Sequence, residues 1–503
     1  MKKYLLVILL SIFAISCSKK VEINGKITGA SPLERFEVIE ASSLGTLPLV
    51  NLGLTKDGTI EGSFEAPNDG MYIINFAARQ AYVYLEAGQK FEFTANAIDF
   101  SESLKISGDA KANNDYLKEL QTYIRNYSQK LNMEAMMAKD EAGFLKEAQK
   151  IKSDLEKSLD DTKSKFKPSS GLYKFKKEEV SASILGLLSQ YESAHQMMTQ
   201  NPSFKVSQKF KDYEAELAKD GDKLVQNQPI YRNYMLNKLA ADYQQYTKAN
   251  VKEDSKQTNS EVFAKYLDTR KDLSQVTKDY LLGFVMGQFD INRQLDPKNK
   301  SALVKLATDK IKDATVKSDI VKLLDAVAGL SVGDLPKDES MVKADGKSFK
   351  ISELKGKPTL VMFYTSWTPY IAESAVPIMK EVSNFYKGKM NFLFVNLDDT
   401  QEQFKKTSAA LFTGIQGTQA HIEGGINSKT AAAWGIYSFK LPSFIVLDKD
   451  GKIASRPFNN LGEQELIDVL DKHTGLKAPT VAPEVTLQND LLKQMTPSAA
   501  PAK

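Results

Sequence analysis

The chain has 503 residues, of which 42% are hydrophobic and 26% charged, a composition that excludes collagen-like and largely disordered proteins. Its 67 Lys and Arg residues nearly balance 63 Asp and Glu residues, so the net charge of +4 gives no reason to expect a nucleic-acid partner. With three His and one Cys, we expect no metal site, no cofactor and no intramolecular disulfide. At roughly 150 residues per domain, this length suggests about three domains.

Residues 1–16 have the pattern of a bacterial lipoprotein signal peptide. A short basic start precedes the apolar run Tyr4–Ile15, which is shorter than the ~20 residues that a membrane-spanning helix needs. The only cysteine, Cys17, follows directly, and residues 14–17 resemble a lipobox in which Ala14 replaces the usual leucine. We therefore expect cleavage before Cys17 and a lipid anchor on its sulfur. An ordinary secretory peptide followed by a chance cysteine is the alternative.

The residues after Cys17 bear on where such a lipoprotein would be sorted. Ser18 permits sorting to the outer membrane in organisms that read this position, and Lys19-Lys20 lacks the acidic residues of a surface-export tag. The sequence therefore predicts a lipid-anchored protein of the bacterial cell envelope, at the outer membrane and facing the periplasm.

Residues 21–110 have the composition and spacing of short β-strands. Asn24-Gly25, Asp57-Gly58 and Asp69-Gly70 are dipeptides typical of hairpin turns. Strand-like runs, rich in aromatic and β-branched residues, occupy 72–76, 82–85 and 91–94. This region is predicted to be an antiparallel β-sandwich.

Residues 113–330 are predicted to form an α-helical domain of several antiparallel helices. Lys, Glu, Gln, Ala and Leu dominate, and apolar residues recur at helical spacing, for example from Phe144 to Leu159 and from Ile184 to Tyr191. Residues 335–475 then alternate between strand and helix patterns, which predicts an α/β domain with a mixed sheet. The remainder, 476–503, is rich in Pro, Ala, Thr and Lys and is predicted to be a disordered tail.

The segment 364–373, Tyr-Thr-Ser-Trp-Thr-Pro-Tyr-Ile-Ala-Glu, closely resembles the active-site turn of thioredoxin-fold envelope proteins of the TlpA/ResA kind. In that family an aromatic strand end leads into Trp-Cys-x-x-Cys and a helix. Residues 395–399 resemble its second core strand, and 434–436, 441–444 and 448–453 resemble its cis-proline strand and closing hairpin. The resemblance implies a thioredoxin fold for residues 335–475. The whole layout also resembles lipoproteins of Bacteroidetes-type bacteria.

The sequence departs from this thiol-disulfide oxidoreductase family at the positions that carry its chemistry. The two redox cysteines of the motif correspond to Thr368 and Ile371. Thiol–disulfide exchange needs a thiolate nucleophile and a sulfur leaving group, and neither an alcohol nor an aliphatic side chain supplies them. Met362 stands where thioredoxins proper carry a buried carboxylate that assists proton transfer. The sequence therefore assigns no catalytic residue and predicts a redox-inactive domain.

Thr368 has two further interpretations. Threonine is a good helix N-cap, and Pro369 suits the first helical position, so the pair is expected to start the helix that the cysteine once began. A hydrolase built around Thr368 would instead need an adjacent base. His421 and His473 are the imidazoles of this region, and nothing in the sequence places either beside Thr368.

Peptide binding is a function that the resemblance still implies, because a binding groove needs no cysteine. In the family the proline matching Pro442 is cis, and the backbone beside it can hydrogen-bond an extended peptide. Trp367, Pro369, Tyr370 and Phe439 would supply contact area around it. Packing of these aromatic residues within the domain is the alternative interpretation.

These observations favour a lipid-anchored, redox-inactive thioredoxin-like protein that binds a peptide or protein partner. Two other classes of function stay open. One is an enzyme, either an oxidoreductase that uses the cysteines of a partner or a Thr368 hydrolase. The other is a structural scaffold in which all three domains support an assembly.

Overall fold

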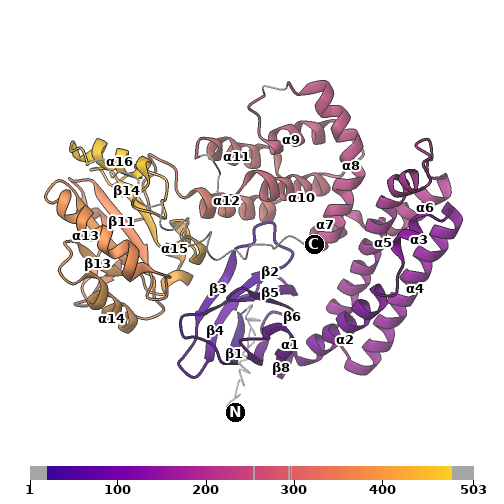
Figure 1. The fold of residues 1–503 in the computed structure, drawn as a ribbon, viewed down its shortest axis with the longest axis horizontal. Coiled ribbons are helices and arrows are strands. Elements are labelled where there is room, and N and C mark those ends of the chain that lie inside the picture. The colour runs from indigo at the N-terminus through magenta and orange to yellow at the C-terminus, as the bar shows by residue number, and fades with distance from the viewer. Residues whose placement is uncertain (1–19, 253–254, 293–294, 296, 479–503) are drawn as a thin grey trace, which may run out of the picture. The chain divides into compact units, whose positions relative to one another are not determined.

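The computed structural model describes residues 20–252, 255–292, 295 and 297–478 (Figure 1). The expected signal peptide, its lipidation site Cys17 and most of the expected tail lie outside the described residues. The chain divides into two compact units. The first contains residues up to Gly329 together with Gly424–Ser438, and the second contains Leu330–Glu423 and the residues from Phe439 onward.

The first unit begins with two four-stranded sheets that enclose one hydrophobic core. One sheet has the order β4(Thr59–Glu65), β1(Lys20–Thr28), β7(Lys90–Asn96), β8(Lys105–Ser107). The other has the order β3(Pro48–Gly53), β2(Arg35–Glu40), β5(Gly70–Phe76), β6(Arg79–Leu85). Every second residue of β1 is buried, and the rings of Phe36 and Phe93 stack across the sheets with centroids 5.2 Å apart.

Asn24-Gly25 is not a turn, contrary to the prediction from the dipeptide. Both residues lie inside β1, where Gly25 pairs with Ile60 of β4 and Phe93 of β7. A Cβ on Gly25 would lie 2.2 Å from the Phe93 ring. The glycine is therefore required by a neighbouring ring in the core and not by a turn. Gly58, in contrast, lies in the turn before β4 with a φ of +81°.

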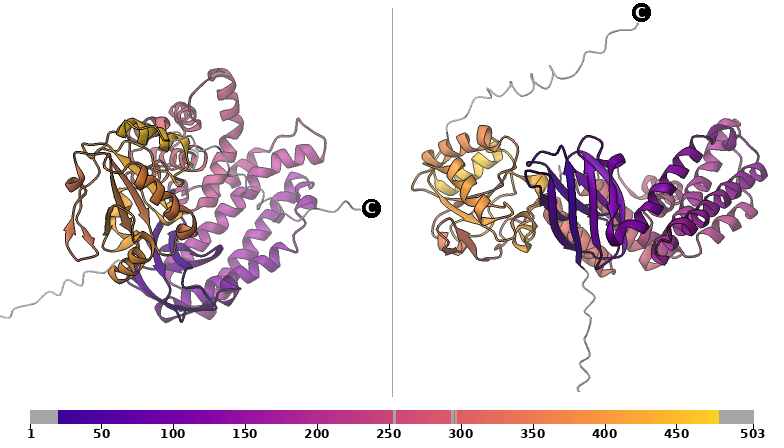
Figure 2. Two further views of the ribbon diagram at one scale, coloured as in Figure 1. Left: turned by 60° about the vertical axis from the view of Figure 1, so that its left-hand side comes forward. Right: turned by 90° about the horizontal axis from the view of Figure 1, so that it is seen from below.

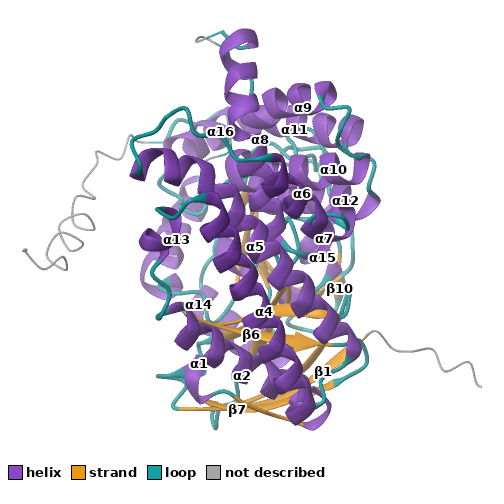
Figure 3. Cartoon of the chain, turned by 90° about the vertical axis from the view of Figure 1, so that its right-hand side faces the viewer, coloured by secondary structure: helices purple, strands orange, loops and turns teal. Residues whose placement is uncertain are grey.

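The middle of the first unit is helical, as predicted. The main helices are α2(Lys111–Ser128), α4(Glu141–Phe166), α5(Ser170–Met198), α8(Pro229–Asn250), α9(Asn259–Thr269), α10(Gln275–Val285), α11(Pro297–Lys310) and α12(Ala314–Ala328). Shorter helical elements are α1(Phe100–Ser103), η1(Gly108–Ala110), α3(Met133–Met137), α6(Gln208–Leu217), α7(Gly221–Asn227) and η2(Met286–Asp290). The two longest helices, α4 and α5, run side by side (Figure 3), and the rings of Phe144 and Tyr191 stack between them at 3.9 Å.

Helix α2 continues the chain directly after the β-sandwich (Figure 2), and a side-chain amide of this helix bonds an edge strand of one sheet. Asn114 of α2 accepts from the amide of Tyr84 and donates to its carbonyl, both at 2.9 Å. Strand β6 is the last strand of its sheet. The asparagine therefore satisfies backbone groups of an edge strand that no further strand pairs with.

A short segment between two strands of the second unit packs within the first unit. It contains η5(Gly425–Asn427) and α15(Lys429–Ala433). The Asn427 side chain bonds both backbone groups of Asn51 on β3, and Ser438 Oγ donates to Glu37 at 2.5 Å. Gly435 has a φ of +66°, and a Cβ there would meet the Asp325 carbonyl at 2.2 Å. Residues 424–438 are thus held by both the β-sandwich and α12.

The second unit is built on a mixed six-stranded sheet of order β10(Ser348–Phe349), β9(Met341–Lys343), β13(Thr418–His421), β12(Asn391–Asn396), β11(Thr359–Tyr364), β14(Ser443–Leu447). Strands β11, β12 and β13 are parallel, whereas β9 and β14 run antiparallel to their neighbours. All six residues of β11 are buried, so both faces of the sheet are covered. The helical elements are η3(Ile351–Leu354), η4(Ile371–Ala375), α13(Val376–Phe385), α14(Gln401–Phe412) and α16(Gln464–Thr474). The short η6(Ser438–Lys440) begins at the last residue of the first unit and continues into the second.

This architecture confirms the predicted fold class: a strand-rich N-terminal part, a helical middle and a C-terminal thioredoxin-like domain with a mixed sheet. No helix among the described residues combines the length and the apolar composition needed to cross a membrane.

Candidate functional site

The candidate site is the turn that follows β11 at the end of the central sheet. Within it, the hydroxyls of Thr365 and Thr368 lie 2.7 Å apart, and Thr368 Oγ1 also accepts from the Thr365 amide at 3.2 Å. The Thr368 amide returns a bond to the Thr365 carbonyl at 3.3 Å. Thr368 is only 4% exposed, so its hydroxyl is held inside the turn.

The expectation that Thr368 and Pro369 begin the helix is wrong. Helical structure starts only at Ile371, with the π-helical turn η4, and the α-helix proper begins at Val376. Tyr370 has a φ of +55°, a left-handed conformation that cannot be part of a helix. Because the Thr368 hydroxyl is already bonded to Thr365, the residue closes the preceding turn instead of capping the helix.

The two positions of the lost cysteines have different surroundings. Thr368 makes hydrogen bonds within its turn. Ile371 is buried in the hydrophobic core of the second unit, together with Met362 and Tyr364 of β11. One position has thus become part of a polar turn and the other part of the apolar core, and neither presents a nucleophile at the surface.

A buried carboxylate lies directly beneath the turn. Asp398 is 0% exposed, and its Oδ1 accepts from the amide of Ser366 at 2.7 Å and from the Ser366 hydroxyl at 2.9 Å. Its Oδ2 accepts from Asn396 Nδ2 at 2.9 Å and from Thr407 Oγ1 at 3.0 Å. Four donors therefore surround this carboxylate, which ties the turn to the end of β12 and to α14.

Asp398, Asn396 and Ser366 were not predicted from the sequence as site residues. A signal was nevertheless present, because Asn396 and Asp398 follow a parallel strand at its carboxyl end. In open α/β sheets that edge is where polar and ligand-binding side chains gather. Ser366 lies in the turn after the neighbouring parallel strand β11, so the same rule brings it to the same edge.

His421 does not reach Thr368. Its Nδ1 lies 3.2 Å from Asn396 Oδ1, and its ring stacks on Phe404. Burial lowers the pKa of His421, which favours the neutral imidazole. The hydrogen-bond partner of the Thr368 hydroxyl is Thr365, not an imidazole, so the arrangement lacks the base that a threonine nucleophile needs.

The proposed groove residues lie partly together. Trp367, Pro369 and Tyr370 share the turn after β11; Trp367 is half-buried, Pro369 is exposed and Tyr370 is 78% exposed. The Leu441–Pro442 bond is cis. Because Ser443 pairs with Phe363 in the antiparallel register of β14 and β11, Pro442 falls opposite Tyr364, at the base of the same turn.

Phe439 belongs to the short element η6 just before Pro442 and is 41% exposed. Asn459 fixes the intervening backbone by donating to the carbonyls of Lys440 and Pro442 at 2.6 and 3.0 Å. Two exposed aromatic side chains, Tyr370 and Phe439, therefore lie on the two chain segments that flank this end of β11 and β14. Among the described residues, no group of His, Cys, Asp and Glu has the arrangement of a metal site.

Comparison with known proteins identifies the C-terminal part of the chain. Residues 307–463 match the family model described as Redoxin, so this part of the chain carries a Redoxin-type domain. A search of curated proteins finds no match.

Solved structures that resemble the chain include three thiol-disulfide oxidoreductase structures from Bacteroides. The C-terminal domain of a candidate thiol-disulfide oxidoreductase from Bacteroides thetaiotaomicron is 27% identical, with 29% of this chain and 97% of that chain covered and a TM-score of 0.26. A thiol-disulfide oxidoreductase from Bacteroides fragilis is 23% identical, with coverages of 28% and 98% and a TM-score of 0.24. The thioredoxin domain of a Bacteroides vulgatus thiol-disulfide oxidoreductase is 19% identical, with coverages of 29% and 99% and a TM-score of 0.25.

Proposed function

We propose that this chain is a lipid-anchored protein of the bacterial envelope whose thioredoxin-like domain has no redox activity and binds an extended peptide or protein partner. The single observation that carries the proposal is that the two positions of the redox cysteines, Thr368 and Ile371, hold side chains without a thiol. Thr368 is bonded to Thr365 within its turn, and Ile371 is part of the core. The fold and the turn are kept, whereas the atoms that exchange disulfides are replaced.

The absence of a cysteine thiol from the thioredoxin-like domain determines what chemistry is possible there. The sequence contains one cysteine, Cys17, which the lipobox resemblance assigns to the thioether of the anchor. Transfer of electrons to a disulfide requires a thiolate that attacks sulfur and a second thiol that releases the mixed disulfide. A threonine alcohol stays protonated and forms no such intermediate, so the domain acts by binding.

Without the cysteines, the turn after β11 can still offer a surface for contact with a partner. Tyr370 and Phe439 expose large aromatic side chains, the residue type that most often supplies binding energy at protein interfaces. The Asp398 network beneath the turn holds the backbone of Ser366 in place. A pre-organised turn of this kind reduces the entropic cost of binding a partner.

Redox inactivity is tested by insulin-disulfide reduction with the purified chain that lacks residues 1–17. We expect a rate equal to the uncatalysed background. The double variant Thr368→Cys, Ile371→Cys, which reinstates both thiols, is the positive control for the scaffold. Turnover above background by the unmodified chain would overturn this part of the proposal.

Binding is tested with peptides selected from a random library against the purified chain. We expect Tyr370→Ala and Phe439→Ala each to weaken binding at least tenfold, the size of effect that a hot-spot aromatic gives. Phe289→Ala is the matched control, because Phe289 is an exposed aromatic of the first unit. Unchanged affinity in the first two variants, or equal loss in all three, would contradict the assignment of the surface and favour a scaffold.

A further inference from the structure

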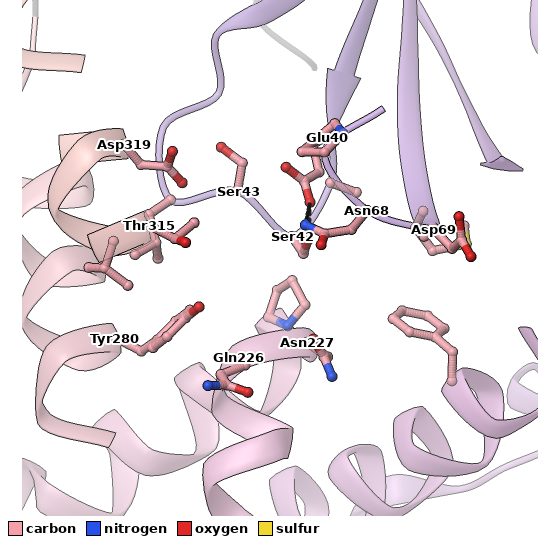
Figure 4. A pocket seen from close by; sticks show the side chains of 18 of the residues that line it. Glu40, Ser42, Ser43, Asn68, Asp69, Gln226, Asn227, Tyr280, Thr315 and Asp319 are labelled. Atoms are coloured by element: carbon pink, nitrogen blue, oxygen red, sulfur yellow. Dashed lines mark hydrogen bonds between the residues drawn. The ribbon is translucent and has the colours of Figure 1, made fainter. Parts of the chain in front are cut away.

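A second site lies in the first unit, remote in sequence from the thioredoxin-like turn. It is a cavity of about 940 Å³ between the end of β2, the loop after it and the helices α5, α7, α10 and α12 (Figure 4). Its wall combines apolar side chains with polar ones, among them Glu40, Ser42, Asn68, Gln226, Thr315 and Asp319 (Figure 4). A volume of this size holds a small organic molecule or a short stretch of peptide.

A buried arginine fixes two walls of this cavity. Arg232 of α8 is 1% exposed and donates to three carbonyls: Val225 at 2.7 Å, Gln226 at 2.5 Å and Ser42 at 2.9 Å. Ser42 and Gln226 both line the cavity. The guanidinium therefore locks the loop after β2 to the end of α7, so the cavity is a built feature of the fold and not a gap between loosely packed elements.

Most carboxylates of the lining already have structural partners. Glu40 accepts from the Ser42 hydroxyl at 3.1 Å and from Asn68 Nδ2 at 3.1 Å, and Asp69 accepts from the amide of Ala87. Asp313 caps α12 by accepting from the amides of Thr315 and Val316. Glu178 is paired with Lys223.

Asp319 differs from these carboxylates. It projects from α12 toward the cavity (Figure 4), and no donor among the described residues hydrogen-bonds to its carboxylate. Burial raises the pKa of Asp319 to about 6; among the neighbouring charges Lys322 acts most strongly and lowers the pKa, whereas Glu40 and Asp313 raise it. Asp319 is half-buried, and its carboxylate reaches the cavity without a donor from the described part of the chain. Partly desolvated carboxylates in cavities are concentrated at functional sites.

We propose that this cavity binds an organic ligand through a primary ammonium group that donates to Asp319, with Glu40 as a nearby second acceptor. An ammonium supplies three hydrogen-bond donors and a positive charge to a carboxylate that accepts no hydrogen bond from the residues that the structure describes. A neutral ligand would remove water from Asp319 without compensating its charge. The rings of Tyr280 and Phe175, which also line the cavity, would contact the carbon chain of the ligand.

The experiment uses cadaverine, a five-carbon diamine, as the probe and follows its binding by saturation-transfer NMR titration at pH 7.5. We expect cadaverine to bind and 1,5-pentanediol, its uncharged analogue of the same length, to bind at least tenfold more weakly. A blocked Gly-Gly-Lys-Gly-Gly peptide distinguishes a free diamine from a lysine side chain, and binding of either supports the proposal. Absence of binding by both, or equal binding of the diol, would overturn it.

Two variants connect the binding to the cavity. Asp319→Asn removes the charge and is expected to weaken cadaverine binding about tenfold or more. Asp309→Asn on α11 is the matched control, since Asp309 is exposed and outside the cavity. Thr315→Arg, at an exposed position of the lining, introduces a competing cation beside Asp319 and should abolish binding without disturbing the core. Wild-type affinity in either cavity variant would contradict the proposal.

Discussion

The side chain of Asn427 makes the two hydrogen bonds to the backbone of Asn51 that a neighbouring strand would otherwise make. Its Oδ1 accepts from the Asn51 amide at 2.7 Å, and its Nδ2 donates to the Asn51 carbonyl at 2.6 Å. Asn51 lies on β3, the edge strand of its sheet, and Asn114 makes the same pair of bonds with Tyr84 on β6 at the opposite edge. Both edges of this sheet are therefore closed by an asparagine amide from outside the sandwich.

Replacement of Asn427 by alanine should weaken the edge of the sheet at β3. The Asn51 amide would lose its partner, whereas the Asn51 carbonyl would keep the bond from Arg35 Nη2 at 3.2 Å, so we expect a cost of about 1–3 kcal/mol. Hydrogen exchange followed by mass spectrometry should show faster exchange in the peptide that covers β3. Asn126→Ala, at an exposed position of α2, is the control and should leave β3 unchanged. Unaltered exchange in Asn427→Ala would mean that residues 424–438 do not stabilise this edge.

Asp398 is expected to be the residue on which the geometry of the turn depends most. Asp398→Ala would remove the acceptor of four donors. The Asn396 amide is buried, whereas Ser366 is exposed and the Thr407 hydroxyl keeps the Gln403 carbonyl, so we expect the second unit to lose about 2–3 kcal/mol. Asp398→Asn keeps the shape but places an N–H₂ group against donors, so an intermediate loss is expected. Denaturant unfolding followed by tryptophan fluorescence measures both variants.

The control for Asp398 is Glu373→Gln, which makes the same change of charge at an exposed position of η4. Its unfolding midpoint should match that of the unmodified chain within about 0.5 kcal/mol, as is usual for exposed positions. Equal stability of Asp398→Ala and the control would show that the network beneath the turn is dispensable.

Asp319 makes the stability of the first unit depend on pH in a defined direction. Its pKa is raised to about 6 in the folded chain from an ordinary value of 3.8. Between these pH values the folded state binds more protons than the unfolded state, so the free energy of unfolding falls as the pH rises. The stability is therefore highest, with respect to Asp319, below pH 3.8 and is lost as the pH rises through 6. We expect Asp319→Asn to equal the unmodified chain near pH 4 and to be more stable at pH 7.5 by about 1–2 kcal/mol, the shift discounted for partial solvation.

Thermal unfolding of both proteins at a series of pH values between 4 and 8 measures this dependence. Asp309→Asn, the exposed control, should show no such divergence. A constant difference between Asp319→Asn and the unmodified chain across the range would place the Asp319 pKa in its ordinary range.

The sequence predicted those parts of the fold that depend on local pattern. The buried run at β11 and the helical spacing of α4 and α5 identified the element type correctly, because burial on both faces and a 3.6-residue period leave direct traces in composition. Gly25 was misassigned because a glycine that clears an aromatic ring and a glycine that makes a turn look the same in sequence. Only the three-dimensional position of Phe93 distinguishes them.

The candidate site was predicted only in part, because some of its geometry depends on tertiary contacts. The motif located the turn, but the partner of the Thr368 hydroxyl, Thr365, and the left-handed Tyr370 result from tertiary packing. The assignment of residues 424–438 to the first unit depends on Asn51 and Asp325, which lie hundreds and roughly one hundred residues earlier in the chain. Such long-range contacts leave no periodicity in a single sequence.

The lipid anchor is tested directly at Cys17. When the full-length chain is expressed in a bacterial host, we expect it to partition into the detergent phase of Triton X-114. Cys17→Ser should move it to the aqueous phase, because a diacyl anchor provides the stable membrane attachment. Ser18→Ala is the control for a change beside the cleavage site. Detergent partitioning of Cys17→Ser would contradict the lipoprotein assignment.

Tyr370 offers a test that separates binding from folding. Its left-handed backbone costs a non-glycine residue about 1–2 kcal/mol, of which glycine recovers part after its own entropy cost of about 0.5–1 kcal/mol. Tyr370→Gly should therefore be about 1 kcal/mol more stable than Tyr370→Ala, while both lose the exposed ring and bind selected peptides equally weakly.

Unfolding midpoints and peptide affinities of the two variants provide the measurement. Ala77→Gly, at another left-handed position, is the control and should gain stability with unchanged binding. If Tyr370→Gly gained stability and kept full affinity, the strained aromatic would have no part in recognition. A residue that is held in an unfavourable conformation and exposed to solvent is better explained by what it contacts in a partner than by anything it contributes to the fold.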